Sequence, residues 1–353
     1  MLNRNYSLQN IDPDKQLYGI DFTFDSFNGM PYRILGNSGL RVSIIGLGTW
    51  KFGFPETGDG ARVNEKTAFA IMDKAMEEGV TFWDTANRYN NASGNSERVI
   101  GRWFKENQNL RRSVVLATKL FGATEGKTPN HCRLSRSNIL ESVYASLERL
   151  QTDYIDVLYF HSFDDTTPVE ESLLAVEDLI SQDLVRYFGV SNFSLDNLKE
   201  YAKYSPEFKR SKVQVVQNRY DILYKESEEA EGALDYCVQN NISFVPWGPL
   251  RQGLLTERYL DKNKVGKGDR LFDENVLNDE LTPDVAKQLQ KLADIAHKYD
   301  MTLQMQTLAY MLTLPAMGSM IAASSTVEQL QENAKAGKIE LNDKQIAEIR
   351  EVI

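Results

Sequence analysis

Strand-like runs and helical patterns alternate along most of this chain, and the alternation constrains the fold more than any other feature. The strand-like runs lie at 44–48, 80–84, 114–118, 155–160, 186–190, 213–217, 242–246 and 319–323. Most are apolar on both faces, as are parallel strands that helices cover on each side. Helical patterns lie between them at 65–78, 135–150, 169–181, 194–204 and 226–240. This order predicts an α/β protein with a (β/α)8 TIM barrel rather than a doubly wound sheet.

The N-terminal part of the chain departs from this alternation. Residues 1–30 are polar without a clear period, and we expect an N-terminal extension that lies on the body of the protein. Short strand-like runs at 32–35 and 40–44 flank turn residues at 36–39, which predicts an N-terminal β-hairpin. Residues 31–353 are expected to form one domain, because barrels commonly run to about 250 residues or more as a single unit.

A stretch at 251–281, rich in Gly, Asp and Lys, follows the seventh predicted strand. In compact domains, loops longer than about 15 residues are usually lids or binding loops. We therefore expect this segment to cover a ligand site at that end of the barrel.

The composition excludes several kinds of partner. Lys and Arg number 40 against 50 Asp and Glu, a net charge of -10, so the backbone of a nucleic acid would be repelled. No apolar stretch approaches the roughly 18 residues that span a bilayer, and the N-terminus lacks the apolar core of a signal peptide. Two cysteines, Cys132 and Cys237, give no disulfide framework and fit a cytoplasmic protein. With three histidines in all, these residues are too scattered for a four-ligand zinc site.

Four polar side chains lie where predicted strands end. Asp84 and Tyr89 follow the second run, Lys119 follows the third, and His161 follows the fourth. Catalytic groups of such barrels sit at the carboxyl ends of the strands, and neighbouring strands lie about 4.8 Å apart, so these side chains can converge. A carboxylate, a phenol, an ammonium and an imidazole together form a proton-transfer site. Taken singly, the same residues could be a buried ion pair, a loop aromatic and a core histidine.

Several motifs between residues 32 and 336 resemble those of the aldo-keto reductase superfamily. They are LGNSGLRVS at 35–43, GLGTW at 46–50, DTANRY at 84–89, GVSNF at 189–193 and EN at 332–333. Within the superfamily, PWGPL at 246–250 and GLLT at 253–256 resemble the branch of aryl-alcohol dehydrogenases and potassium-channel β-subunits. The resemblance implies a barrel enzyme that reduces an aldehyde or ketone to the alcohol with a nicotinamide cofactor.

The resemblance also implies a role for each polar residue at the strand ends. Tyr89 would be the general acid that protonates the carbonyl oxygen as hydride arrives. Lys119 would lower the pKa of that phenol, which is near 10 in isolation, and Asp84 would keep Lys119 charged. His161 would bind and orient the substrate carbonyl, with its second nitrogen held by a neighbour. Trp50 would form a wall of the substrate pocket.

Cofactor-binding residues are implied around the same rim. Ser191, Asn192 and Gln217 match residues that bind the nicotinamide carboxamide, and Trp247 matches an aromatic residue that stacks on the nicotinamide ring. At the floor and wall of the site the matches are Thr49, Trp50 and Asp84. Backbone N–H groups of Gly248, Leu250 and Gly253 could bind the pyrophosphate. Arg270 matches a residue that binds a phosphate, and the adenosine-binding matches are Ser325, Gln329, Glu332 and Asn333.

NADP is the cofactor that we expect, with NAD as the alternative. Members of the superfamily usually carry an Arg or Lys after the eighth strand that pairs with the 2′-phosphate of NADP. Here residues 321–333 read IAASSTVEQLQEN, without a cation, so Arg270 in the long loop is the cation matched to that phosphate. A second departure is YNNASG at 89–94, where a tighter Gly-rich turn is more usual, and this changes the edge of the pocket.

Two other functions stay open at this stage. Channel β-subunits keep this fold and cofactor while acting mainly as binding partners, and residues 1–30 leave room for such a role. A redox-neutral or oxidative sugar enzyme could use the same site, since a fold does not fix a function. The preferred prediction is a cytoplasmic NAD(P)H-dependent oxidoreductase that acts, as a monomer or a homo-oligomer, on a small carbonyl substrate, with no nucleic-acid or membrane partner.

Overall fold

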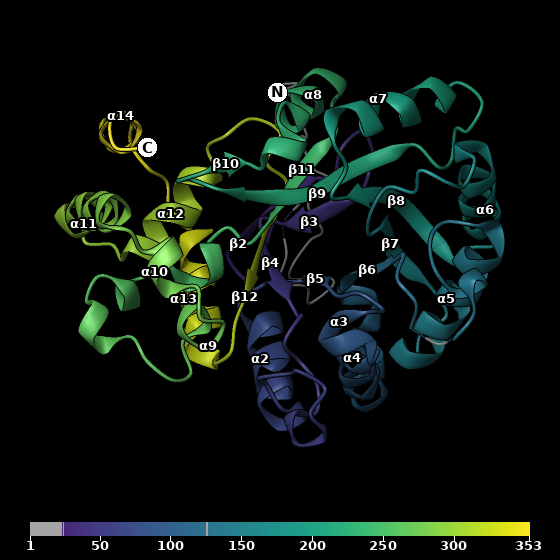
Figure 1. Ribbon diagram of the computed structural model, residues 1–353, viewed down its shortest axis with the longest axis horizontal. Coiled ribbons are helices and arrows are strands. Elements are labelled where there is room, and N and C mark those ends of the chain that lie inside the picture. The colour runs from purple at the N-terminus through teal and green to yellow at the C-terminus, as the bar shows by residue number, and fades with distance from the viewer. Residues whose placement is uncertain (1–22, 24, 125) are drawn as a thin grey trace.

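A ring of parallel strands forms a closed barrel in the computed structural model, which describes residues 23, 25–124 and 126–353 (Figure 1). In their order around the ring the strands are β4 (Ile45–Gly48), β5 (Phe82–Asp84), β6 (Val115–Leu120), β7 (Ile155–Phe160), β8 (Val185–Ser191), β9 (Val213–Asp221), β11 (Ser243–Trp247) and β12 (Met320–Ala323). Pairing of β8 with β9 and of β12 with β4 closes the ring. The predicted (β/α)8 barrel is therefore confirmed, with a strand at each predicted run.

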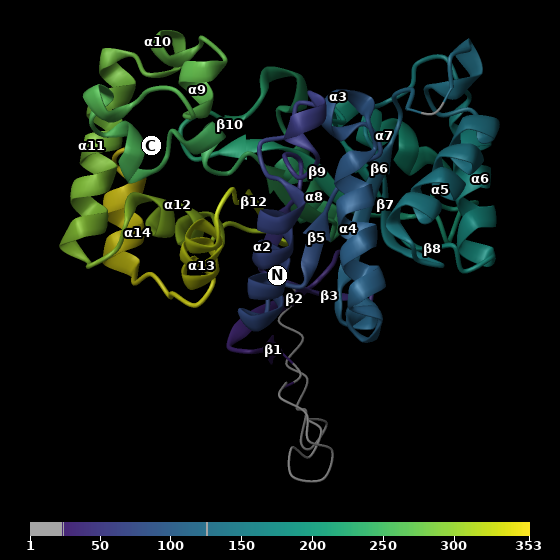
Figure 2. The same ribbon diagram turned by 90° about the horizontal axis from the view of Figure 1, so that it is seen from below.

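Helices surround the strands on all sides (Figures 1 and 2). They are α2 (Glu65–Glu77), α4 (Asn95–Glu106), α5 (Arg136–Leu150), α6 (Val169–Ser181), α7 (Leu195–Tyr204), α8 (Ala233–Asn240), α11 (Pro283–Lys298), α12 (Leu303–Met311), α13 (Val327–Ala336) and α14 (Asp343–Arg350). The patterns at 65–78, 135–150, 169–181 and 194–204 are helices to within one residue at each end. Among the described residues, no helix is long and apolar enough to cross a membrane.

The helix predicted at 226–240 begins later than expected. Glu226 belongs instead to the two-residue strand β10 (Lys225–Glu226), which pairs with β9. Gly232 has a φ of 83°, which no right-handed helix contains, and α8 starts at the next residue. The carboxylate of Glu226 accepts from the backbone N–H groups of Gly232 and Leu234 at 3.1 and 2.7 Å, so it caps the helix that it was expected to begin.

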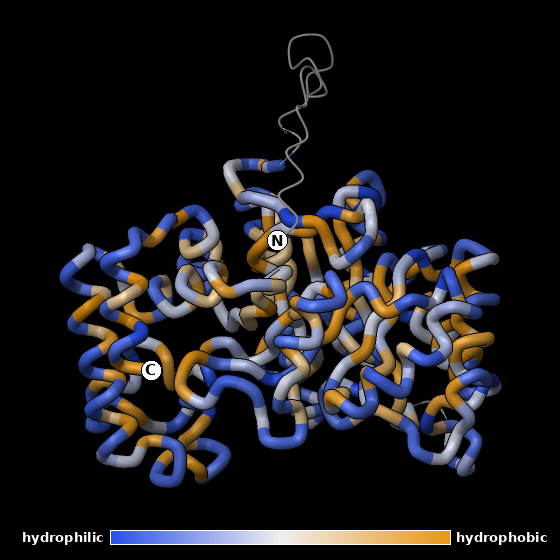
Figure 3. The backbone as a smooth tube through the Cα atoms, turned by 90° about the horizontal axis from the view of Figure 1, so that it is seen from above, coloured by the Kyte–Doolittle hydropathy of each residue, from blue (hydrophilic) through white to orange (hydrophobic). Residues whose placement is uncertain are grey.

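Two apolar cores hold the barrel together. The inner core fills the barrel with buried side chains from alternate strand positions, including Ala117, Val157 and Tyr159. The outer core lies between the strands and the ring of helices. Along the outer helices the backbone alternates between hydrophilic and hydrophobic stretches, as expected for helices with one face in solvent (Figure 3).

A small antiparallel sheet closes one end of the barrel. It contains β1 (Ser26–Phe27), β2 (Met30–Ile34) and β3 (Arg41–Ser43), so the predicted hairpin is confirmed with one additional strand. Leu35 and Val42, both fully buried, extend from this sheet into the inner core. This sheet and the short helices α3 (Tyr89–Ala92), α9 (Arg270–Asp273) and α10 (Leu277–Glu280) lie at opposite ends of the barrel in Figure 2. The open end is therefore the one where the strands finish.

The segment at 251–281 is more ordered than a simple loop. It contains the 3-10 turns η5 (Arg251–Gly253), η6 (Glu257–Tyr259) and η7 (Lys262–Lys264), followed by α9 and α10. Arg251 anchors its base through ion pairs with Asp221 at 3.1 Å and Glu280 at 2.5 Å. Leu254 and Leu271 are fully buried, so this segment packs on the barrel.

Candidate active site

Lys119 lies at the centre of the polar side chains that end the strands. Its Nζ donates to Asp84 Oδ1 at 2.5 Å, to the Tyr89 hydroxyl at 2.7 Å and to the Thr85 carbonyl at 2.8 Å. The Tyr89 hydroxyl also donates to Asp84 Oδ1 at 3.3 Å. Asp84 and Lys119 are each 1% exposed, whereas Tyr89 keeps part of its surface open. The predicted convergence of these three side chains is confirmed.

Strand geometry explains this convergence. Side chains alternate along a strand, so Ala117 and Lys119 of β6 point into the barrel while Thr118 points outward. Asp84 ends β5, the neighbour of β6. Its register partner on β6 is Ala117, two residues before Lys119 on the same face of the strand. Tyr89 comes five residues later, in the turn that brings the chain back over the strand ends.

Burial shifts the pKa values of Tyr89 and Lys119 in opposite directions. Burial raises the pKa of the Tyr89 phenol well above its ordinary value, and the Asp84 carboxylate raises it further. Burial lowers the pKa of Lys119, and the Asp84 carboxylate opposes that shift. Burial and the Asp84 carboxylate together thus raise the pKa of the phenol in this arrangement, and the predicted lowering of that pKa by Lys119 stays a prediction. The phenol is protonated at neutral pH, which is the form that a proton donor needs.

His161 lies beside Tyr89 at the open end of the barrel. Their ring centroids are 6.0 Å apart with an interplanar angle of 73°. Nδ1 of His161 is buried and, within the described part of the chain, has no hydrogen-bond partner, so the expectation of a neighbour that holds it is wrong. Burial lowers the pKa of the imidazole to about 3, and the charges of Lys119 and Arg88 add to the shift. His161 is therefore a neutral ring.

We predict that His161 does not titrate between pH 5 and 8. Since its pKa is about 3 in the folded chain and about 6.5 in an unfolded one, the unfolded state binds more protons between these values. Its contribution to stability is thus complete above pH 6.5 and falls as the pH drops toward 3. Long-range ¹H–¹⁵N spectra of the three imidazoles should contain one that is unchanged over this range and absent in His161→Gln. Three titrating rings would contradict the neutral assignment.

A buried network beneath the site was not predicted. Thr49 Oγ1 donates to the Asp84 carbonyl at 2.9 Å, and the Ser96 hydroxyl lies 2.8 and 2.9 Å from those of Thr49 and Thr85. Glu97, fully buried, accepts from Thr118 at 2.5 Å and from Arg149 at 2.7 Å. The sequence does contain a signal for this network, namely polar residues on the apolar face of a helix. Ser96 and Glu97 lie on the same face of α4 as buried residues such as Ile100 and Phe104.

The predicted nicotinamide residues form a continuous strip on the other side of the rim. Trp247 is 38% exposed, and its Nε1 donates to Asn192 Oδ1 at 2.9 Å. Asn192 Nδ2 donates to the His161 carbonyl at 2.9 Å and lies 3.2 Å from Ser191 Oγ. These contacts fix the edge of the indole and leave a large part of the ring in solvent.

Two of the predicted cofactor contacts look different in the structure. Gln217 is 1% exposed, and its Nε2 donates to Asp84 Oδ2 at 2.7 Å, so here it holds the carboxylate. The N–H of Gly253 donates to the Leu250 carbonyl at 2.9 Å, and the predicted contact of Gly253 with the pyrophosphate stays a prediction. Gly248, with a φ of 70° and open space beside its Cα, keeps the geometry that allows close approach of a ligand. For Gly248 and Leu250 the pyrophosphate role stays a prediction.

The predicted adenosine residues lie at the end of β12 and along α13. Gln329 Oε1 accepts from the Ser325 N–H at 2.7 Å, and Glu332 accepts from Thr302 at 2.6 Å. Asn333 is 1% exposed, and its two amide atoms bond Gln304 and Ser324 at 2.6 and 3.1 Å. Asn333 thus joins α12, α13 and β12, and adenosine binding by this group stays a prediction.

Arg270 lies over the ring of Trp50, the predicted wall of the substrate pocket. Its guanidinium carbon is 4.3 Å from the centroid of Trp50, a ring that is 36% exposed and 6.4 Å from that of Tyr89. Glu274 accepts from its Nε at 2.9 Å. Arg270 therefore needs to leave both partners to reach a phosphate.

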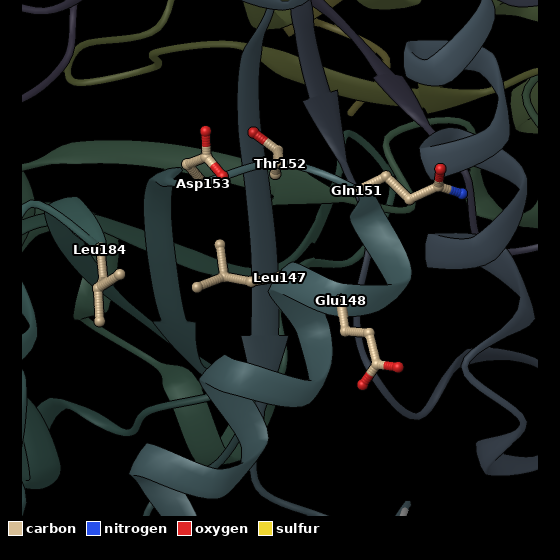
Figure 4. Close-up of a pocket in the computed structure, with 6 residues that line it drawn as sticks. All are labelled: Leu147, Glu148, Gln151, Thr152, Asp153 and Leu184. Carbon is tan, nitrogen blue, oxygen red and sulfur yellow. The ribbon is translucent and has the colours of Figure 1, made fainter.

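The hollow drawn in Figure 4 belongs to the other end of the barrel. It lies where α5 ends and β7 begins, and its lining residues are Leu147, Glu148, Gln151, Thr152, Asp153 and Leu184. None of the candidate catalytic side chains lies there, so this hollow is separate from the site described above.

Comparison with known proteins decides the family. A model of the aldo/keto reductase family matches residues 44–353. The chain belongs to the aldo/keto reductase family. The resemblance of its motifs is thereby confirmed, and the chain is an oxidoreductase of that family.

Three relatives illustrate the range of proteins similar to this family member. Aldo-keto reductase AMT2 of Alternaria alternata is 37% identical over 64% of this chain and 66% of its own length. A probable voltage-gated potassium channel subunit beta of Arabidopsis thaliana is 32% identical over 87% of this chain and 91% of its own. Uncharacterized oxidoreductase YrpG of Bacillus subtilis is 35% identical over 90% of this chain and 94% of its own.

Proposed function

We propose that this family member reduces an aldehyde or ketone to the alcohol with NAD(P)H, and that Tyr89 is the proton donor. The observation that carries the proposal is the 2.7 Å contact from Lys119 Nζ to the Tyr89 hydroxyl. That hydroxyl is protonated, the Tyr89 side chain is partly exposed, and its ring centroid lies 6.0 Å from that of the neutral His161 imidazole. A carbonyl oxygen between Tyr89 and His161 would receive its proton from the phenol while the imidazole orients it.

Each remaining side chain assists the proton donor. Asp84 and the Thr85 carbonyl hold the Lys119 ammonium group in place. That ammonium group stabilises the phenolate that forms when Tyr89 gives up its proton. Burial of Asp84 and Lys119 excludes water, which strengthens these electrostatic interactions.

The residues of the rim fit a nicotinamide cofactor. Trp247 offers an exposed indole whose edge is fixed by Asn192, and the Asn192 and Ser191 side chains lie directly beside it. A nicotinamide cofactor, when bound, supplies the hydride. Trp247, Asn192 and Ser191 would hold its ring, and the end of β12 would hold the adenosine. Both cysteines are free, which supports the proposed cytoplasmic setting.

A binding subunit is the second candidate function. The Arabidopsis relative that is named as a probable channel subunit matches this chain over 91% of its own length. Turnover separates the two candidates, because a reductase consumes NADPH continuously with a carbonyl panel, whereas a binding subunit holds the nucleotide with little turnover. Product analysis then identifies the alcohol and distinguishes reduction from isomerisation.

We predict weak discrimination between the two nicotinamide cofactors, with NADPH preferred over NADH by roughly tenfold or less. Residues 321–333 contain no cation, and Arg270 must give up Trp50 and Glu274 to bind a 2′-phosphate. Arg270→Ala should remove the remaining preference, as measured by Kd from quenching of Trp247 fluorescence.

Arg258→Ala is the matched control for this measurement. Arg258 lies in the same segment, pairs with Asp269 at 2.9 Å and is 53% exposed at its side chain. It should leave the ratio of the two Kd values unchanged. A preference for NADPH above a hundredfold, or a preference that survives in Arg270→Ala, would show that another cation binds the phosphate.

A further inference from the structure

Arg88 lies at the entrance of the candidate active site with an unpaired charge. It is exposed, and within the described part of the chain its guanidinium has no hydrogen bond or ion pair. A guanidinium presents a planar set of donors that matches carboxylate and phosphate groups. Several other cations of this rim are paired with carboxylates, namely Lys119 with Asp84, Arg62 with Asp273 and Arg270 with Glu274.

The chain directs this side chain toward the reacting groups. Arg88 immediately precedes Tyr89, and its side chain lies against the backbone of Gly122, just after β6. A Cβ at position 122 would fall 2.8 Å from Cδ and from Nη1 of Arg88, so glycine makes room for it. The charge of Arg88 also acts on His161, whose pKa it lowers together with burial and Lys119. Arg88 is therefore exposed between the turn that carries Tyr89 and the segment that follows β6, near enough for its charge to act on the imidazole.

A strained turn holds this arrangement. Asn90, Asn91 and Ala92 have φ values of 54°, 58° and 57°, in the left-handed region that Asn tolerates and that Ala disfavours. Asn90 Nδ2 anchors the turn by donating to the Phe52 carbonyl at 2.6 Å. Strain of this kind is retained where it places functional groups. Here it places Tyr89 together with the residue before it.

The position of Arg88 also separates it from the predicted cofactor strip. Ser191, Gln217 and Trp247 belong to β8, β9 and β11, while Arg88 and Gly122 follow β5 and β6 on the far side of the ring. The net charge of the chain is -10, so its overall field repels anions and only a local cation can retain one.

We propose that Arg88 binds an anionic group of the substrate, so that the preferred substrates are aldehydes or ketones that carry a carboxylate or a phosphate. This inference rests on the proposed function, because it names the substrate class of the same site. His161 and Tyr89 hold the carbonyl, and Arg88 selects the charged end. No catalytic step depends on Arg88, which sets specificity.

The test compares charged and neutral forms of one substrate. kcat/KM is measured for 4-oxobutanoate and 5-oxopentanoate against their methyl esters, and for glycolaldehyde phosphate against glycolaldehyde. The proteins are wild type, Arg88→Met, Arg88→Lys and the control Arg112→Met. Arg112 is also exposed and, among described residues, without a side-chain partner, but it precedes β6 at the closed end of the barrel.

We expect the wild type to prefer at least one charged form tenfold or more, a factor equivalent to about 1.4 kcal/mol. Arg88→Met should bring that ratio close to one, Arg88→Lys should retain part of it, and Arg112→Met should retain all of it. The carboxylate and phosphate arms show which anion is preferred. A ratio near one in the wild type, or a ratio retained in Arg88→Met, would overturn the inference.

Binding separates this inference from the proposed function. If the wild type reduces neither form, the reductase proposal fails, and calorimetric titration of the NADPH-loaded protein with 4-oxobutanoate and with inorganic phosphate still tests Arg88. If 4-oxobutanoate or phosphate binds the wild type at least tenfold more tightly than it binds Arg88→Met, the result supports an anion site at Arg88. Equal affinities overturn it.

Discussion

Tyr89→Phe is expected to lower kcat for carbonyl reduction by at least roughly a hundredfold, since general acid catalysis contributes about 10²–10⁴. The variant loses only the hydroxyl that accepts from Lys119 Nζ at 2.7 Å and donates to Asp84 at 3.3 Å. The ring keeps its contacts with Trp50 and His161. Cofactor Kd should therefore change little, and steady-state kinetics with fluorescence titration measures both quantities.

Tyr32→Phe is the matched control for that variant. Tyr32 lies at the closed end of the barrel, and its hydroxyl is 2.6 Å from that of Thr81. The same chemical change there should leave kcat within a small factor of the wild-type value. A wild-type kcat in Tyr89→Phe would remove Tyr89 from the mechanism.

Lys119→Met should lose both turnover and stability. The substitution leaves the Asp84 carboxylate, 1% exposed, without its cation, and breaking a buried pair in this way costs about 3–5 kcal/mol. The phenol would then face an uncompensated carboxylate, so the pH profile of alcohol oxidation should move to higher pH. Urea denaturation and kcat against pH measure the two effects.

A double variant separates chemistry from stability. In Asp84→Asn with Lys119→Met the buried charge is gone, so most of the lost free energy of unfolding should return. Turnover should stay low, because the ammonium group that stabilises the phenolate is still missing. Recovery of activity together with stability, or an unshifted pH profile in the single variant, would make Lys119 a structural residue only.

The barrel was predictable because its signals are local. Period, length and apolarity on both faces identified every strand of the barrel ring, but not the two-residue strands β1 and β10. Ser194 caps α7 as its position suggested, with its side chain accepting from the Asn197 N–H. Strand ends in a parallel barrel share one rim, so the sequence alone predicted that Asp84 and Lys119 lie close together. The predicted start of α8 was wrong because Glu226 does not belong to the first turn of the helix. Its carboxylate instead accepts hydrogen bonds from backbone N–H groups at the helix start, six and eight residues later.

Contacts made across the barrel were not predictable from local patterns. The unpartnered Nδ1 of His161 and the position of Arg270 over Trp50 each depend on which distant segments meet in space. The raised pKa of Tyr89 likewise depends on how deeply the ring is buried, which residue type alone does not determine. The roles carried over from the family therefore stay predictions, while the contacts of each side chain had to come from the structure.

Transfer of deuterium from cofactor to product tests the central claim most directly. The protein is incubated with NADPH deuterated at C4 and an aldehyde panel that includes charged and neutral members, and the alcohols are analysed by mass spectrometry. We predict deuterium on the carbinol carbon in proportion to the NADP formed, over many turnovers, with a loss of at least roughly a hundredfold in Tyr89→Phe. Tight nucleotide binding without labelled alcohol, or equal labelling by wild type and Tyr89→Phe, would contradict the account.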